Sequence, residues 1–181
     1  NPEGRVVEIL GKKFDFKTER LSIIKNADLP LEFPLKVTRA AESVPDSVRL
    51  QDKIGRRDLT DELIVTIDGD DSRDFDDAVS VSENGDGTFT LGVHIADVSA
   101  YVLKGDEIDR EALNRSTSVY FPEEVLPMLP FKLSNGICSL NEGVIRLTLS
   151  CFMKIDPSGN VLSHKIKKTA IRSAHRMTYN D

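Results

Sequence analysis

The sequence has no run of 18 or more apolar residues, the length that would point to a transmembrane helix. Its N-terminus also lacks the charged stub followed by an apolar core that marks a secretory signal. We therefore expect no membrane contact and no secretion. Hydrophobic residues make up 39% of the 181 residues and charged residues 30%, which argues against wholesale disorder. The length suits one domain, or one domain with a piece of a neighbour.

Cysteine is scarce, and the two that occur, Cys138 and Cys151, form no C-x-x-C pair of the kind that binds metals. Cys151 lies in an alternating apolar run, so we expect a small core residue rather than a redox group. A reducing, cytoplasmic compartment is the expectation.

Positive charge is also in deficit, because the formal net charge is -6, and this argues against a nucleic-acid partner. The charges are segregated, however. Residues 161–180 hold five basic residues and no acid, while residues 68–77 hold six aspartates. Such segregation is expected of a protein that binds a polyanion in one place and metal ions in another. For the basic stretch by itself, a solvated strand face is the favoured interpretation.

The first third of the sequence predicts little regular structure. Residues 5–10 are typical of a short strand, and residues 1–30 resemble the end of a domain. Residues 31–62 are expected to form a linker, with a helix that starts at Pro34 and ends before Pro45 and an extended connector over 46–62.

From residue 63 to residue 181 the pattern is that of a β-rich domain. Strands are predicted at 63–67 and 78–82, and a return strand at 88–95 would place Phe89, Leu91, Val93 and Ile95 on one face. A helix at 105–115, a long structured loop at 116–143 and a hairpin of 145–155 with 161–171 follow. The predicted fold class is α+β with a mixed or antiparallel sheet.

The segment from Thr66 to Ala78 carries the chemistry, since it crowds six carboxylates into one loop. Carboxylates this close repel one another, and a hard divalent cation such as magnesium or manganese relieves that repulsion. An EF-hand calcium loop fails, because Arg73 stands where glycine is needed and Val79 where glutamate is needed. A solvated acidic turn remains an open alternative.

Several ordered motifs resemble the ribonuclease II/ribonuclease R (RNB) superfamily, with bacterial ribonuclease R nearest. They are the aspartate segment 66–79, Gly-Arg-Arg-Asp-Leu at 55–59, His-Ile-Ala-Asp-Val at 94–98, Ser-Thr-Ser-Val-Tyr-Phe-Pro at 116–122, Pro-Met-Leu-Pro at 127–130 and Leu-Ser-Asn-Gly-Ile-Cys-Ser-Leu at 133–140. The resemblance implies the N-terminal part of an RNB catalytic domain over 63–181. It also implies that residues 1–30 are the end of a cold-shock-type (OB) β-barrel.

By this resemblance, Asp68 and Asp77 would hold the ion that binds the scissile phosphate. Asp74 and Asp76 would act in catalysis by holding a second ion or its bound water, two ions about 4 Å apart being a common arrangement for phosphodiester hydrolysis. The expected cofactor is Mg²⁺, for which Mn²⁺ could substitute.

Three further residues receive roles, and the resemblance supplies the first of them. Tyr120 would stack on a terminal base of the RNA. His94 alternates away from the apolar face of its strand, so a structural or outer-shell role is favoured over direct catalysis. Asp97 is expected to cap or pin the following turn.

The implied activity is processive 3′-to-5′ hydrolysis of single-stranded RNA to nucleoside 5′-monophosphates. Single-stranded RNA is the expected partner, and the ribosome or RNA-decay factors are further candidates. Because the later part of the catalytic domain is absent here, we expect little or no activity from this chain alone. A noncatalytic RNA-binding homologue and an acidic surface on a scaffold protein remain as rival interpretations.

Overall fold

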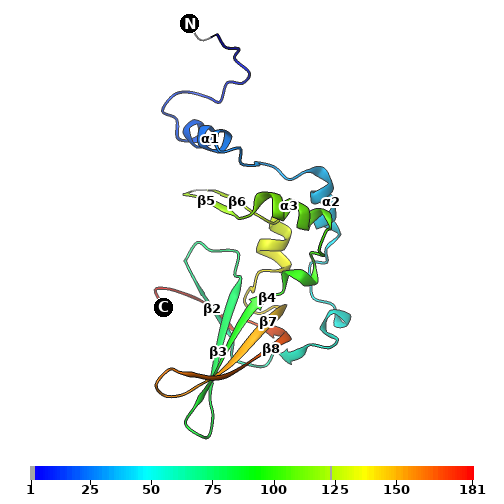
Figure 1. Cartoon of the computed structure of the whole chain (residues 1–181), viewed down its shortest axis with the longest axis vertical. Coiled ribbons are helices and arrows are strands. Elements are labelled where there is room, and N and C mark those ends of the chain that lie inside the picture. The colour runs from blue at the N-terminus through cyan, green and yellow to red at the C-terminus, as the bar shows by residue number, and fades with distance from the viewer. Residues whose placement is uncertain (1–2, 123) are drawn as a thin grey trace.

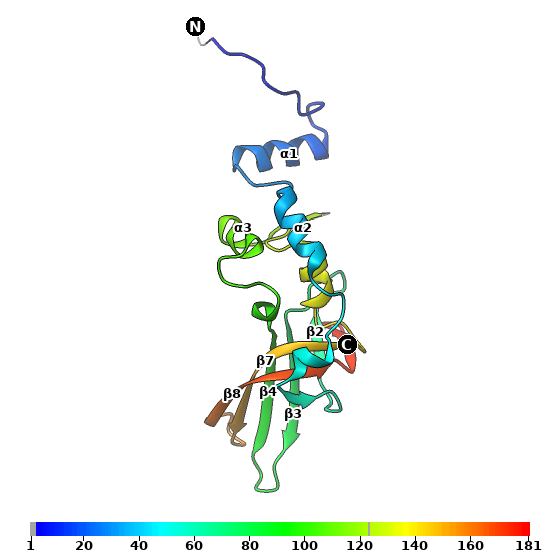
Figure 2. The same cartoon turned by 90° about the vertical axis from the view of Figure 1, so that its right-hand side faces the viewer.

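The computed structural model describes residues 3–122 and 124–181. The molecule is elongated, with a curved sheet at one end, a helical layer next to it and the N-terminal segment extending away at the far end (Figures 1 and 2). Within the described residues, no helix is both long and apolar enough to cross a membrane.

The sheet has seven strands in the order β1-β8-β7-β4-β3-β2-β9. Antiparallel pairs form its centre, whereas β1 pairs parallel with β8 and β2 pairs parallel with β9. The mixed sheet of the predicted α+β class is confirmed. The strands are β1 (Arg57–Leu59), β2 (Val65–Asp68), β3 (Asp77–Glu83), β4 (Phe89–Ala96), β7 (Ile145–Ile155), β8 (Val161–Arg172) and β9 (His175–Thr178).

A helical layer lies beside the sheet and packs around its own core of buried apolar side chains, among them Val37, Ile108, Leu133 and Ile137. The helices α2 and α3 agree with the predicted ones, and Asp106 caps α3 by accepting a hydrogen bond from the Asp109 backbone amide (2.7 Å). The elements of this part are α2 (Leu35–Ser43), α3 (Glu107–Arg115), the short helices η1 (Leu50–Lys53), η2 (Val98–Ala100) and η3 (Lys132–Ile137), and a separate hairpin of β5 (Val119–Phe121) and β6 (Glu124–Leu126).

Three predictions for the N-terminal half and the long loop were wrong. No strand forms within residues 5–10, because no strand of the described residues pairs with this apolar run. Instead α1 (Phe16–Asn26) forms behind the N-cap Asp15, which accepts from the Thr18 amide. The connector 46–62 is not wholly extended, because η1 forms in it and β1 adds to the sheet edge. The loop 116–143 contains β5, β6 and η3.

The buried face of β4 is also the opposite of the one predicted. Ile95 is 47% exposed and Phe89 39%, whereas His94 is fully buried. The reason is that the second core, which includes Leu59, Phe75 and Leu140, packs on the face of the sheet that carries Ala78, His94 and Ala96. Cys151, on the same side of the sheet as Ile95, is only half-buried rather than a core residue.

Candidate functional site: an acid loop beside an exposed tyrosine

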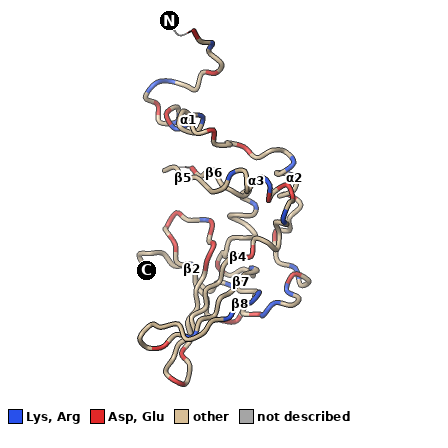
Figure 3. Tube along the Cα trace, viewed as in Figure 1, with Lys and Arg blue, Asp and Glu red and all other residues tan. Residues whose placement is uncertain are grey.

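The acid loop, residues 68–77, connects two neighbouring antiparallel strands of the sheet. Asp68 is the last residue of β2 and Asp77 is the first residue of β3. The chain therefore leaves the sheet with one carboxylate and re-enters it with another, and Asp74 and Asp76 lie on the loop between. Figure 3 shows acidic residues along the loop that follows β2.

Phe75 anchors this loop to the interior of the protein. Its side chain is buried in the second core, its amide donates to Ser139 Oγ (3.0 Å), and its carbonyl accepts from the Leu140 amide (2.8 Å). The Ser139 hydroxyl in turn donates to the Arg73 carbonyl (3.0 Å). Because Phe75 points into the protein, its neighbours Asp74 and Asp76 are held at the loop surface.

Arg176 of β9 fixes the loop from the other side. Its guanidinium lies 5.1 Å from the centre of the Phe75 ring and donates to the carbonyls of Gly69 and Asp70. The Arg176 guanidinium thus bonds the backbone of the acid loop and not its carboxylates.

The charges of the four predicted ligands act on one another. The pKa of Asp68 is raised by burial and then by the negative charges of Asp77 and Asp74. Although the Asp76 side chain reaches solvent, desolvation by the surrounding protein raises its pKa, and Asp74, Asp77 and Asp68 add to the effect. One oxygen of Asp68, Oδ2, is buried with no hydrogen-bond partner among the described residues. A cation bound here would relieve both the repulsion and the unpaired oxygen.

The predicted ligands are nevertheless not assembled as a complete cage. Across residues 3–122 and 124–181, no group of three aspartate, glutamate, histidine or cysteine side chains is arranged to hold a metal ion. Carboxylate chemistry and the unpaired oxygen of Asp68 fit a divalent cation, and the arrangement of the four side chains as ligands stays a prediction.

Tyr120 lies across a cleft from the acid loop, on the hairpin of β5 and β6. Its hydroxyl donates to Asp74 Oδ2 at 2.6 Å, and this bond is the main reason that its pKa is raised to about 12. The cleft holds about 710 Å³, and of the four predicted ligands only Asp74 lines it, together with Tyr120. With 66% of its surface exposed, the Tyr120 ring is accessible to a ligand.

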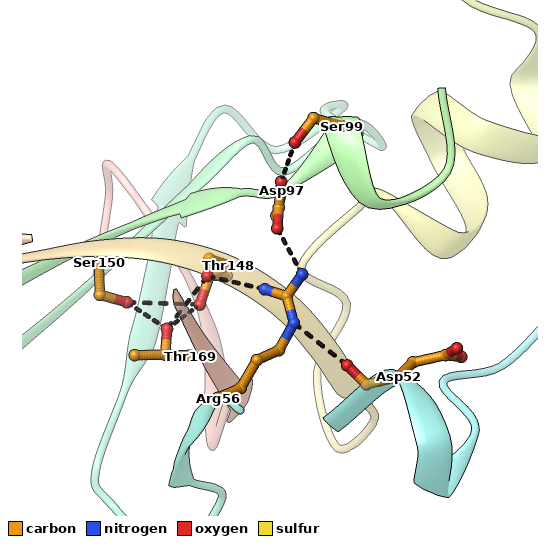
Figure 4. Close-up of polar contacts among 7 residues, drawn as sticks. All are labelled: Asp52, Arg56, Asp97, Ser99, Thr148, Ser150 and Thr169. Atoms are coloured by element: carbon orange, nitrogen blue, oxygen red, sulfur yellow. Dashed lines mark hydrogen bonds and ion pairs between the residues drawn. The ribbon is translucent and has the colours of Figure 1, made fainter. Parts of the chain in front are cut away.

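Asp97 follows β4 and makes a buried ion pair with Arg56 (Figure 4). The two side chains approach to 2.6 Å, and Ser99 donates its hydroxyl to the other Asp97 oxygen (2.6 Å). Burial raises the pKa of Asp97, but these hydrogen bonds and the charge of Arg56 outweigh it, so the pKa is lowered. Asp97 sits at the N-cap position of η2, and its side chain bonds the Ser99 hydroxyl instead of a backbone amide.

His94 lies in the sheet, in hydrogen-bond contact with the hydroxyls of Ser80 (3.0 Å) and Ser150 (2.7 Å). Burial lowers its pKa to about 4, so the ring is neutral near pH 7. These contacts suit the structural role that was favoured for His94.

Sequence reasoning gave no role to three residues that hold the site together: Arg56, Ser139 and Arg176. The first two lie inside motifs that carried the family resemblance, and Arg176 was counted only as part of the basic stretch. Their partners are distant in sequence, which is why the pattern alone did not assign them.

Comparisons with known proteins identify the family. The RNB domain model matches residues 56–181 and a cold shock domain model matches residues 1–34. Ribonuclease R of Thermotoga maritima is 51% identical over 99% of this chain, and that of Escherichia coli 42% over 97%. The chain spans only 26% and 22% of these relatives.

Two solved structures extend the likeness to three dimensions. Mycoplasma genitalium RNase R in complex with double-stranded RNA is 35% identical with a TM-score of 0.88, over 94% of this chain and 30% of that one. Yeast Ssd1, described as a pseudonuclease, is 25% identical with a TM-score of 0.79, over 93% and 22%. Because the RNB model covers well over half of the residues, this chain belongs to the RNB domain family.

Proposed function

We propose that this chain is the part of an RNA-degrading exoribonuclease that carries its divalent-cation site, the acid loop 68–77. The observation that carries the proposal is the unpaired, buried Oδ2 of Asp68, which lies among carboxylates: the charges of Asp74 and Asp77 add to the raised pKa values of Asp68 and Asp76. The relatives named ribonuclease R support the same activity, although the chain spans about a quarter of their length.

In this proposal four of the six aspartates of the loop hold cations. Asp68 and Asp77, at the two strand ends, would hold the cation that contacts the scissile phosphate, and Asp74 and Asp76 would hold a second cation or its water. Bound Mg²⁺ or Mn²⁺ supplies positive charge at the transferring phosphate and activates the attacking water. Phe75 and Arg176 keep the loop in place while the carboxylates exchange contacts.

The finer substrate assignment is processive 3′-to-5′ cleavage of single-stranded RNA to nucleoside 5′-monophosphates. The exposed Tyr120 ring supports it, because an aromatic face beside the acid loop can stack on any base. Two proposals concern the N-terminal part: residues 1–30 are a remnant of a cold-shock-type barrel, and residues 31–62 are a linker. We also propose a cytoplasmic location and contacts with the ribosome or RNA-decay factors. The 181 residues alone should have little or no activity.

Replacing Asp76 with asparagine in the full-length protein tests the catalytic role. The Asp76→Asn variant should lose cleavage of 5′-labelled single-stranded RNA under Mg²⁺ while its RNA affinity, measured in EDTA, stays within about threefold of wild type. Asp61→Asn is the matched control, because Asp61 is an almost fully exposed carboxylate away from the loop. Near-normal turnover by Asp76→Asn would remove Asp76 from the mechanism.

A noncatalytic RNA-binding role is the second candidate. It is favoured by the lack, among the described residues, of an assembled three-ligand group, and by the similarity to a pseudonuclease. Titrating Mg²⁺ or Mn²⁺ into full-length protein with labelled RNA separates the two: shortening of the RNA supports the nuclease, and binding without shortening supports the second candidate.

A further inference from the structure

The basic residues of β8, to which the proposed mechanism gives no role, gather with β1 at the edge of the sheet. We call Arg57, Lys165, Lys167 and Lys168 the basic edge. These four side chains, together with Phe152, Gly55 and Arg56, line a cleft of about 420 Å³. In the strand order β1 and β8 are separated from β2 by three strands, so the basic edge is distinct from the acid loop.

The basic edge makes no ion pair inside the described part of the protein. None of its four side chains lies within 4 Å of a carboxylate there, and all four residues are exposed. By contrast, neighbouring cations are paired: Lys53 with Asp58 and Arg56 with Asp97. In a chain with a net charge of -6, four unpaired cations around one cleft imply an external anion.

The cations are also held in a regular geometry. Lys165, Lys167 and Thr169 alternate along one face of β8, so the two lysines are about 6.6 Å apart along the strand. Arg57 pairs with Thr169 across the parallel β1–β8 ladder, and its guanidinium lies 5.0 Å from the centre of the Phe152 ring. Cations that repeat regularly along a strand suit a polymer with regularly spaced negative charges better than a single small anion.

We propose that the basic edge is an accessory site for the phosphodiester backbone of single-stranded RNA. The inference deepens the proposed function and depends on it for the identity of the polyanion. The cleft offers cations and a ring whose face is already covered by Arg57, so it binds phosphates without reading bases. It would hold RNA that extends beyond the acid loop.

Salt dependence of RNA affinity tests this directly. Each phosphate contact to a single strand contributes roughly 0.7 to the slope of log affinity against log salt concentration. The double variant Lys165→Gln/Lys167→Gln of the full-length protein should therefore bind a labelled 30-residue oligouridylate more weakly, with a slope smaller by about 1.4. The titration is run in KCl with EDTA, so that the readout does not depend on cleavage.

The matched control is Lys17→Gln/Lys104→Gln, which removes the same charge from two other exposed positions. An unchanged slope in the β8 variant, or an equal loss in the control, would overturn the proposal. Displacement of the RNA by polyglutamate at equal charge concentration would instead identify the edge as a site for acidic proteins, and would also overturn it. Cleavage of a five-residue RNA should stay unchanged in the β8 variant; if no RNA is cleaved by wild type, the proposed function fails separately.

Discussion

The hydroxyl of Tyr120 donates a hydrogen bond to Asp74 Oδ2 at 2.6 Å, joining residues 46 positions apart on the β5–β6 hairpin and on the acid loop. The bond closes one side of the cleft and leaves the ring exposed. The hydrogen-bond partner of Asp74 is thus a neutral hydroxyl and not a cation. Tyr120 couples the proposed base-stacking surface to the proposed metal ligands.

Tyr120→Ala should weaken RNA binding by about 1–3 kcal/mol, the value of one base stacked on an aromatic ring. Tyr120→Phe keeps the ring and loses only the bond to Asp74, so its affinity should stay near wild type. Fluorescence anisotropy of labelled RNA in EDTA measures both. If the two variants bind equally well, the ring does not contact a base.

Asp97→Asn should lower the free energy of unfolding by about 3 kcal/mol, because it leaves the Arg56 guanidinium buried without its counter-charge. The side chains of Arg56 and Asp97 are only 8% and 1% exposed. Urea denaturation measures the change. The control Asp86→Asn breaks an exposed ion pair with Lys154, which solvent screens, and should lower the free energy of unfolding far less. If both variants lose the same free energy of unfolding, the buried Arg56–Asp97 pair stabilises the protein no more than the exposed pair does.

Acid should destabilise the protein through His94. Its folded-state pKa of about 4 lies below the ordinary 6.5, so between these values the unfolded chain binds the proton more readily. The contribution of the neutral, buried His94 to stability is therefore fully present above pH 6.5. It is lost as the pH falls toward 4, which lowers the free energy of unfolding by at most roughly 3 kcal/mol.

Thermal melts between pH 7.5 and pH 4.5 test this sign. His94→Asn should flatten the decline in melting temperature relative to wild type, whereas His164→Asn, on the exposed part of β8, should leave it unchanged. The same decline in melting temperature in all three proteins would show that groups other than His94 cause it.

Phe75→Ala should cost about 3–5 kcal/mol of stability, since it empties a buried site and frees the acid loop from Arg176. Phe75→Leu keeps most of the volume and should cost less. Chemical denaturation gives the free energies, and hydrogen exchange of the Leu140 amide, which bonds the Phe75 carbonyl, reports on the loop anchor. Unchanged exchange in Phe75→Ala would contradict the anchoring role.

The sequence predicted the elements whose signals are local. The turn between β3 and β4, the helix after Pro34 and the helix behind Asp106 each carry their own start or turn residues. Asp15, the N-cap of α1, is such a signal as well, whereas the apolar run before it predicts a strand that the structure does not form.

The sequence did not predict which distant segments of the chain contact one another. The burial of His94 instead of Ile95 depends on which segments cross each face of the sheet. Likewise, Ser139 reaches Phe75 over 64 positions, and Arg176 reaches Gly69 over 107. The aspartates were found by composition and resemblance, whereas the partner of Asp74 and the unpaired oxygen of Asp68 needed coordinates.

Cation binding by the acid loop is measured most directly by calorimetric titration of Mn²⁺ into the full-length protein and its Asp68→Asn variant without RNA. Wild type and the Asp61→Asn control should show saturable binding and a higher melting temperature with Mn²⁺, and Asp68→Asn should lose both. Identical binding curves for wild type and Asp68→Asn would contradict the assignment of the acid loop as the cation site.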